Sequence, residues 1–162
     1  MYIDCLMQDI KYRFMKLGEE SFVSELALKA FNEFIAYECT DEGIYEIKSF
    51  FDTEAIKKRS EENSFVLVSV FNEQIIGMLE MQEYRHLSML FVNKEFHRNG
   101  IARGLLNKSI EIALSKNPRL RNITVNSSRY AEPVYQRMGF VRTQRMQIEK
   151  GIKFIPMALK LI

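Results

Sequence analysis

The first third of the chain combines a short strand pattern with two amphipathic helical patterns. Residues 11–17 alternate enough to predict a strand, which Gly18 ends. The first helical pattern consists of apolar side chains at helical spacing: Phe22, Val23, Leu26, Ala27, Ala30, Phe31, Phe34 and Ile35. A second helical region is expected over residues 41–59. It is interrupted near Asp52, because Asp52-Thr53-Glu54 resembles a helix cap.

The centre of the chain carries three strand patterns in succession. Residues 65–71 are rich in β-branched and aromatic side chains, and Asn72-Glu73 indicates a tight turn after them. Two further strands are expected over residues 75–82 and 87–92.

The second half predicts a long helix over residues 100–115, stopped by Asn117-Pro118. A short buried strand follows at 123–126, and then a short helix at 131–138 with Gly139 as its C-cap.

The end of the chain predicts a closing hairpin. Its arms are residues 140–148 and 152–161, with Lys150-Gly151 at the turn, and Pro156 indicates an edge or bulged position. Strands thus alternate first with helices and then with each other. This order predicts a mixed α/β (α+β) fold with a mostly antiparallel central sheet flanked by helices.

Length and composition are typical of one globular domain over residues 1–162. The 162 residues are 47% hydrophobic and 27% charged, with no repeat or flexible linker. Two cysteines, Cys5 and Cys39, and two histidines favour a reducing, cytoplasmic setting and argue against a metal site.

Secretion and membrane insertion are disfavoured. The longest apolar stretch, around residues 65–71, is far shorter than a membrane span. Asp4 and Asp9 lie where a signal peptide needs positive charge and then an apolar core.

Charge is distributed unevenly along the chain. Residues 1–84 contain 17 acidic and 8 basic side chains, whereas residues 85–162 contain 4 acidic and 15 basic ones. A basic second half favours an anionic partner, either a phosphorylated cofactor or a nucleic acid, and an acidic first half favours a cationic substrate. The same numbers of acidic and basic side chains would also be found if both halves only presented charged surfaces to solvent.

A strand that leads through a polar turn into a helix at Gly100 could bind an anion. The free N–H groups of a first helical turn attract anions, and Gly100 and Ala102 leave room for a phosphate. His97, Arg98 and Arg103 add donors and positive charge. The segment is neither a P-loop nor a dinucleotide-binding glycine motif, and an ordinary helix start remains the alternative.

A second segment, residues 126–140, carries two candidate functional groups. Asn126 ends a buried strand, where its amide could bind amide groups of an extended ligand. Tyr135 lies on the short helix, and its phenol could protonate a leaving thiolate. A core aromatic with a hydrogen-bonded hydroxyl is the alternative for Tyr135.

Taken together, the two segments resemble the GNAT superfamily of acetyl-CoA-dependent N-acyltransferases. The family pattern Gln/Arg-x-x-Gly-x-Gly/Ala is similar to His97-Arg98-Asn99-Gly100-Ile101-Ala102, with His97 in place of Gln or Arg. A later Asn followed by Tyr-x-x-x-Gly-Phe is similar to Asn126 and to Tyr135-Gln-Arg-Met-Gly-Phe140. The expected order of strands and helices also agrees over nearly the whole chain.

The resemblance implies acetyl-CoA as cosubstrate, no metal, and a role for each matching position. A splayed strand at Leu90, Phe91 and Val92 would bind the pantetheine arm, and Asn126 would meet it across the splay. Tyr135 would be the general acid for the departing CoA thiolate. The turn that would hold the pyrophosphate comprises His97, Arg98, Asn99, Gly100, Ile101, Ala102 and Arg103.

Transfer to an amine also requires removal of a proton, directly or through water. Glu80, Glu83 and His86 are candidates, with Glu80 favoured and His86 second because its ordinary pKa suits the task. Each could instead be a surface residue, and a dedicated base could be absent.

The expected acceptor is an amine-bearing small molecule or peptide. It would contact the loops near residues 37–45, where acidic side chains could attract a cation. These are Glu38, Asp41, Glu42 and Glu46. A homodimer through the C-terminal hairpin is an option, although its apolar residues could equally fill the monomer's own core.

Two other functions compete with acyl transfer. A non-catalytic acyl-CoA-binding or regulatory module would be expected to lack the general acid, whereas Tyr135 is present. A nucleic-acid binder would need surface aromatics interleaved in a basic stripe, which the sequence does not show.

Overall fold

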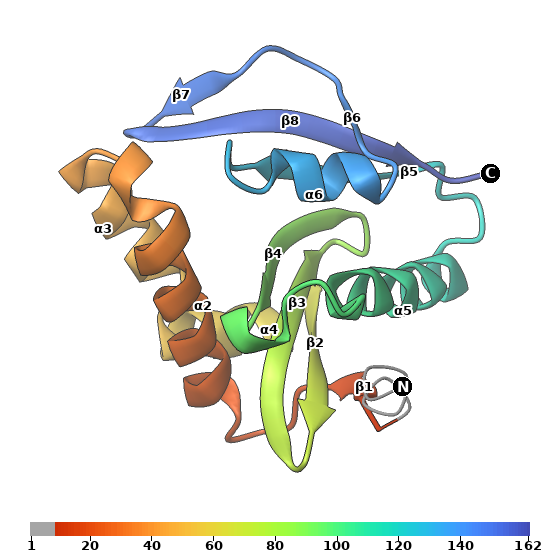
Figure 1. The fold of residues 1–162 in the computed structure, drawn as a ribbon. Helices are drawn as coiled ribbons and strands as arrows, with labels where there is room; N and C mark the ends of the chain where they lie inside the picture. Colours follow the sequence, from red (N-terminus) through yellow and green to blue (C-terminus); the bar gives the residue numbers. More distant parts are fainter. Residues whose placement is uncertain (1–8) are drawn as a thin grey trace.

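The computed structural model describes residues 9–162, so the expectations that rest on Asp4 and Cys5 lie outside the described residues. The first half runs through one strand, a series of helices and an antiparallel three-strand unit (Figure 1). Its elements are β1 (Lys11–Phe14), α2 (Glu20–Phe34), the 3₁₀ turn η1 (Ala36–Glu38), α3 (Asp41–Phe50), α4 (Thr53–Glu61), β2 (Ser64–Phe71), β3 (Gln74–Gln82) and β4 (His86–Val92).

The second half adds the long helix and the C-terminal strands (Figure 1). Its elements are the 3₁₀ turn η2 (Lys94–Phe96), α5 (Ile101–Lys116), β5 (Asn122–Ser127), α6 (Glu132–Arg137), β6 (Val141–Arg142), β7 (Gln147–Glu149) and β8 (Ile152–Lys160).

The expected break in the second helical region is confirmed at Asp52. Its side chain accepts a hydrogen bond from the N–H of Glu54 at 3.1 Å and caps α4. Thr40 caps α3 in the same way, accepting from the N–H of Gly43 at 3.2 Å. Such caps satisfy otherwise free N–H groups, which explains why one apolar pattern yields two helices.

One mixed sheet organises the molecule, as the alternating strand patterns predict. Its strand order is β1-β2-β3-β4-β5-β8-β6, with β7 also paired to β8. Every described pairing is antiparallel except that of β4 with β5. The mixed, mostly antiparallel sheet flanked by helices is therefore confirmed.

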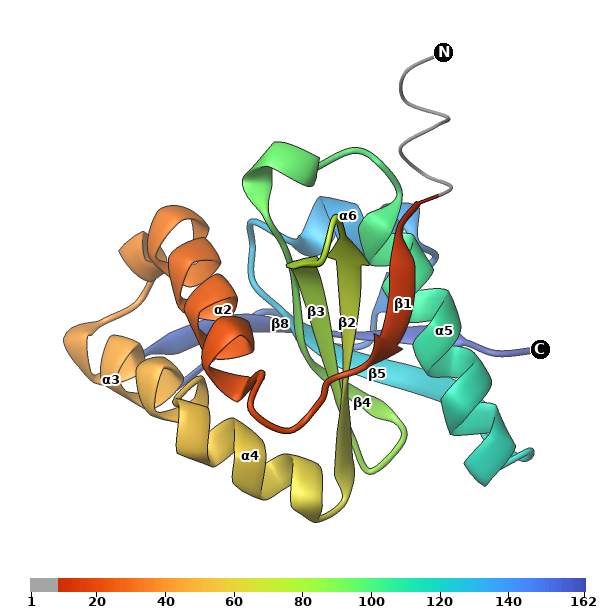
Figure 2. The same cartoon turned by 90° about the horizontal axis from the view of Figure 1, so that it is seen from below.

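Helices cover both faces of the sheet (Figure 2). Because strand side chains alternate between faces, each face has its own buried cluster. Leu79 and Met81 of β3 pack with Leu105 of α5 in one cluster. Met78 of β3 packs with Phe31 of α2 and Ile56 of α4 in the other. Truncating a buried side chain such as Phe31, which is 1% exposed, would cost about 3–5 kcal/mol.

The two terminal elements differ in detail from expectation. The first strand ends at Phe14 rather than at residue 17. The first arm of the closing hairpin is not one strand, because β6 and β7 are short, exposed and separated. Pro156 faces the gap between them, where only the N–H of Thr143 donates to its carbonyl, at 2.9 Å. Because proline has no N–H, it cannot donate a ladder hydrogen bond to an uninterrupted neighbouring strand, which accounts for the break between β6 and β7.

Candidate active site

The candidate site lies where the sheet opens between β4 and β5. Within the described sheet, these strands pair only at His86 with Thr124 and Leu87 with Val125. Beyond Leu87 they diverge, and α6 lies over the end of β4 with α2 on one side and α5 on the other (Figure 1). The end of β4, the start of α5, α6 and the end of α2 line a cleft of about 460 Å³.

One wall of this cleft is the N-terminus of α5. Gly100 is its N-cap residue and is left-handed, with φ 74°, a conformation that glycine adopts without a steric penalty. Among residues 9–162 no side chain caps this helix, and its first turn contains no acidic residue. The N–H groups of Ile101, Ala102 and Arg103 therefore remain available to an anion, and the helix dipole favours negative charge there.

Basic side chains surround this helix end but also have structural partners. The Nε2–H of His97 donates to the carbonyl of Val92 at 2.8 Å, so one ring nitrogen fixes the turn to β4. Arg103 donates to the carbonyl of Arg137 at 2.7 Å and joins α5 to α6. Arg98 lines the cleft from a left-handed position, with φ 64°. The positive charges flank the free N–H groups, as phosphate binding requires.

Tyr135 forms part of the opposite wall. It lies on α6, is buried, and packs edge-on against Phe140 with ring centroids 5.3 Å apart. Burial raises the pKa of the Tyr135 phenol well above its ordinary value, because the phenolate would lose its hydration. The hydroxyl is thus held protonated at neutral pH, which is the form that can donate a proton.

The structure brings most of the expected cofactor-binding positions into this one cleft. Nine of the eleven line it: Leu90, Phe91, Val92, His97, Arg98, Gly100, Ile101, Ala102 and Arg103. Asn99 lies outside the lining, and its side-chain amide donates to the carbonyl of Phe96 at 3.1 Å, so it shapes the turn. Asn126 also lies outside the lining, exposed on β5 opposite Pro156.

Glu80 does not reach the cleft, contrary to its expected role as the favoured base. Its side chain is fully buried on β3 and forms a paired contact with Arg59 of α4. Arg59 Nε donates to Oε1 at 2.6 Å and Nη2 to Oε2 at 3.0 Å, while the guanidinium lies 3.7 Å from the Phe50 ring centre. With both oxygens bound to the Arg59 guanidinium, the carboxylate holds α4 against the sheet.

His86 is placed at the point where β4 and β5 part. It is half-buried, and its Nδ1 lies 2.8 Å from Thr124 Oγ1. Burial, with the nearby Arg85 charge, lowers the pKa of the imidazole, so the neutral form dominates at neutral pH. Glu83, the third candidate, is an exposed turn residue paired with Arg85 at 2.8 Å.

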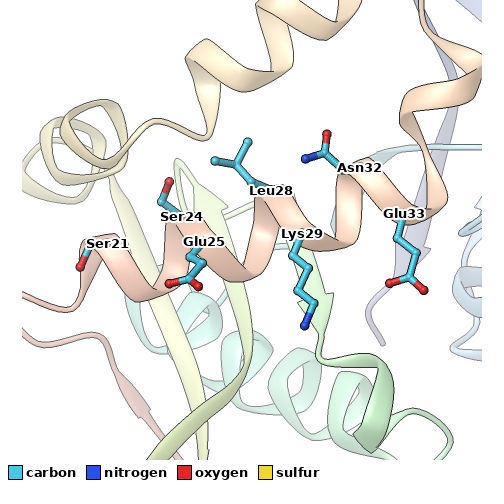
Figure 3. Close-up of a pocket in the computed structure, with 7 residues that line it drawn as sticks. All are labelled: Ser21, Ser24, Glu25, Leu28, Lys29, Asn32 and Glu33. Carbon is cyan, nitrogen blue, oxygen red and sulfur yellow. The ribbon is translucent and has the colours of Figure 1, made fainter.

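Sequence reasoning missed the aromatic part of the cleft. Phe34 and Ile35 were expected only as apolar positions of a helix face, and Tyr130 was not singled out, yet all three line the cleft. The available signal was a large aromatic residue, Tyr130, two positions before the first residue of α6 and five before Tyr135. A second hollow, lined only by α2 residues, is an open surface without any of the expected site residues (Figure 3).

Over residues 9–162, no group of three or more His, Cys, Asp or Glu side chains is placed to hold a metal ion. In the same part of the chain, no helix combines the length and apolar character needed to cross a bilayer.

Comparison with known proteins gives matches in sequence and in structure. Residues 35–161 match the family described as acetyltransferase (GNAT) domain. The uncharacterized N-acetyltransferase YafP of Escherichia coli is 31% identical over 86 residues, which are 53% of this chain and 52% of YafP. The chain spans about half the length of the curated relatives it matches.

Two solved structures share the fold. The PaiA N-acetyltransferase of Thermoplasma acidophilum, in complex with coenzyme A, has a TM-score of 0.74 at 20% identity and covers 94% of this chain and 99% of that one. The spermidine/spermine N-acetyltransferase SpeG of Vibrio cholerae has a TM-score of 0.62 at 18% identity, covering 96% and 94%. With the family match over most of its length, this chain belongs to the GNAT acetyltransferase domains.

Proposed function

We propose that this protein transfers an acetyl group from acetyl-CoA to a primary amine of a small molecule or peptide. One observation carries the proposal: the uncapped N-terminus of α5 and Tyr135, whose buried phenol stays protonated, line the same cleft. The first can hold a pyrophosphate and the second can protonate a thiolate. The opening between β4 and β5 can take an extended arm between them.

The residues present fit acetyl-CoA as cosubstrate. The N–H groups of Ile101, Ala102 and Arg103 would bind the pyrophosphate, with Arg98 adding charge. The edge of β4 over Leu90, Phe91 and Val92, which has no ladder partner in the described part of β5, would offer its peptide groups to the pantetheine arm.

Transfer by a direct route then needs two proton movements. As the amine nitrogen bonds to the acetyl carbon and the C–S bond breaks, the Tyr135 Oη would donate its proton to sulfur. A proton must also leave the amine. With Glu80 bound to Arg59, we assign this step to the neutral imidazole of His86, which does not itself line the cleft and would therefore act through a water.

The acceptor would be cationic in its resting form. Glu38 of η1, whose side chain is 13% exposed, lies across the opening from Arg129 at 4.0 Å. Glu46 forms an ion pair with Lys150 at 3.9 Å. Asp41 and Glu42 occupy the first turn of α3, where they also stabilise that helix. SpeG is a spermidine/spermine N-acetyltransferase by name, which supports testing polyamines first.

A screen of amines with acetyl-CoA, followed by detection of the released thiol, tests the proposal. Polyamines, amino acids, aminoglycosides and lysine peptides would each be offered at equal concentration. We expect amine-dependent thiol release and an acetylated product by mass spectrometry. Tight binding of acetyl-CoA with no turnover on any amine would instead favour a non-catalytic acyl-CoA-binding module.

A further inference from the structure

Two aromatic rings from opposite sides of the opening stack against each other. Phe34 is the last residue of α2, and Tyr130 lies in the turn between β5 and α6. Their ring centroids are 4.7 Å apart and their planes differ by 14°. Both rings line the cleft.

Each ring is fixed to a different half of the sheet. The helix that ends at Phe34 is anchored by Phe31, which is buried with Met89 of β4. The turn that carries Tyr130 is fixed on the β5 side, where the N–H of Ala131 donates to Ser128 Oγ and that of Glu132 to the Ser128 carbonyl, both at 3.1 Å. The stack therefore bridges the two halves where β4 and β5 no longer pair.

The surroundings of the stack indicate a surface for a ligand rather than a core contact. Tyr130 is 44% exposed, unlike the buried aromatic rings of the two cores. The ring of His97 lies 5.8 Å from that of Phe34, so the stack adjoins the turn that leads to α5. Flat, half-exposed rings beside a cleft offer large apolar area at a low cost in side-chain entropy.

On the basis of the proposed function, we propose that the Phe34–Tyr130 stack is the outer wall of the channel for the thioester-bearing arm of acyl-CoA. The arm is an alkyl chain with two amides, and the ring faces pack against its methylene groups while β4 binds its amides. The nucleotide end of the ligand lies beyond this wall, at the N-terminus of α5. Phe34 and Tyr130 are thus binding residues for the arm alone.

Titration calorimetry with two ligands separates the arm from the nucleotide. Coenzyme A carries both parts, and adenosine 3′,5′-bisphosphate carries only the nucleotide end. For Tyr130→Ala we expect the Kd of coenzyme A to rise roughly 3- to 10-fold, the range of one aromatic contact. The Kd of the bisphosphate should stay within about twofold of the unmodified protein.

Three further variants complete the test. Tyr130→Phe keeps the ring and should bind coenzyme A like the unmodified protein. Phe34→Leu keeps an apolar side chain but removes the stacked ring, so it should raise the Kd of coenzyme A and leave that of the bisphosphate unchanged. Tyr45→Ala removes a tyrosine that is 71% exposed on α3, outside the cleft lining, and should change neither Kd. Thermal melting confirms that each variant is folded before titration.

The outcomes separate the two proposals. An unchanged Kd of coenzyme A in both Tyr130→Ala and Phe34→Leu would overturn the proposal that the stack lines the channel. An equal rise in the Kd of coenzyme A and of the bisphosphate would overturn it too, because such a rise indicates a change in the whole binding site rather than the loss of a contact with the arm. Absence of coenzyme A binding in the unmodified protein would overturn the proposed function itself.

Discussion

At the scale of single residues, the chemistry depends on how each titratable group is surrounded. Tyr135 is buried among apolar neighbours and keeps its proton, whereas Glu80 is buried against a guanidinium and keeps its charge partner. Burial thus has opposite consequences for the two groups. Of the two, Tyr135 lines the cleft and Glu80 does not.

Replacing Tyr135 by phenylalanine removes the proposed proton donor and little volume. We expect kcat to fall about 10²- to 10⁴-fold, the usual contribution of general acid catalysis, while the Kd of acetyl-CoA changes little. Steady-state kinetics and calorimetry measure the two quantities. Tyr130→Phe, a loss of hydroxyl in the same cleft, is the matched control, and equal kcat values for both variants would contradict the role of Tyr135.

If His86 is the base, its pKa determines the acidic limb of the pH–rate profile. Burial lowers the pKa of its imidazole, so the ring becomes protonated only as the pH falls below its ordinary value of about 6.5. As the proposed base, His86 would accept a proton only in its neutral form, so kcat/KM should be flat near neutral pH and fall on acidification through that lowered pKa. In His86→Gln this limb should disappear together with much of the rate. A profile that keeps the same limb would assign it to another group.

The sequence alone predicted the Tyr135 position because a fixed spacing to Gly139 and Phe140 carries it. It did not predict the fate of Glu80. The partner, Arg59, lies 21 residues away on a different element, and a pairing of that kind depends on how α4 packs on the sheet. The Phe34–Tyr130 stack was missed for the same reason.

At the scale of elements, the Arg59–Glu80 pair joins α4 to β3. Glu80 is fully buried, and the Arg59 side chain is 16% exposed. Removing one member of such a pair leaves an uncompensated charge, which costs about 3 kcal/mol or more. We therefore assign the pair a structural rather than a catalytic role.

Two charge-neutralising variants test this assignment. Glu80→Gln should lower Tm by roughly 6–12 °C, while kcat of the folded protein stays near that of the unmodified enzyme. Glu83→Gln is the control, because its pair with Arg85 is exposed and contributes little. A large loss of kcat with an unchanged Tm in Glu80→Gln would restore Glu80 as the base.

Helices and central strands were predictable because hydrophobic periodicity and caps determine them locally. The pattern placed α5 and the three central strands within one or two residues of their bounds. The closing hairpin was predicted less well. Its first arm is divided where residues 143–146 have no ladder partner in the described part of β8. Pro156 indicated an irregular position in the second arm, but no pattern within residues 140–148 marks the division of the first.

At the scale of the whole molecule, the uneven charge distribution has a geometric counterpart. Basic residues of the second half flank the α5 N-terminus, and acidic residues of the first half lie on η1 and α3. The two regions therefore lie on different elements. The opening between β4 and β5 was expected only from the family resemblance, as a splay at Leu90, Phe91 and Val92. The strand patterns alone did not predict it, because it depends on the register of two strands that are separated by α5.

Neutralising the acidic region tests its role in acceptor binding. We expect a variant with Glu38, Asp41 and Glu42 changed to their amides to raise the KM of a cationic amine several-fold at low salt. The effect should shrink as ionic strength rises, since Asp41 and Glu42 are exposed and such charges are screened over about 10 Å at 0.1 M. Asp41 and Glu42 also favour the start of α3, so thermal melting accompanies the kinetics. An unchanged KM would contradict electrostatic attraction of the acceptor.

The most direct measurement is calorimetric titration of the purified protein with acetyl-CoA, alongside the variants Gly100→Asp and Gly100→Asn. Both substitutions introduce a similar side chain at the same left-handed position, and only aspartate adds negative charge at the α5 N-terminus. The account predicts saturable one-site binding that Gly100→Asp abolishes and Gly100→Asn weakens far less. No binding by the unmodified protein, or equal binding by all three, would contradict the claim that this cleft holds acetyl-CoA on the start of α5.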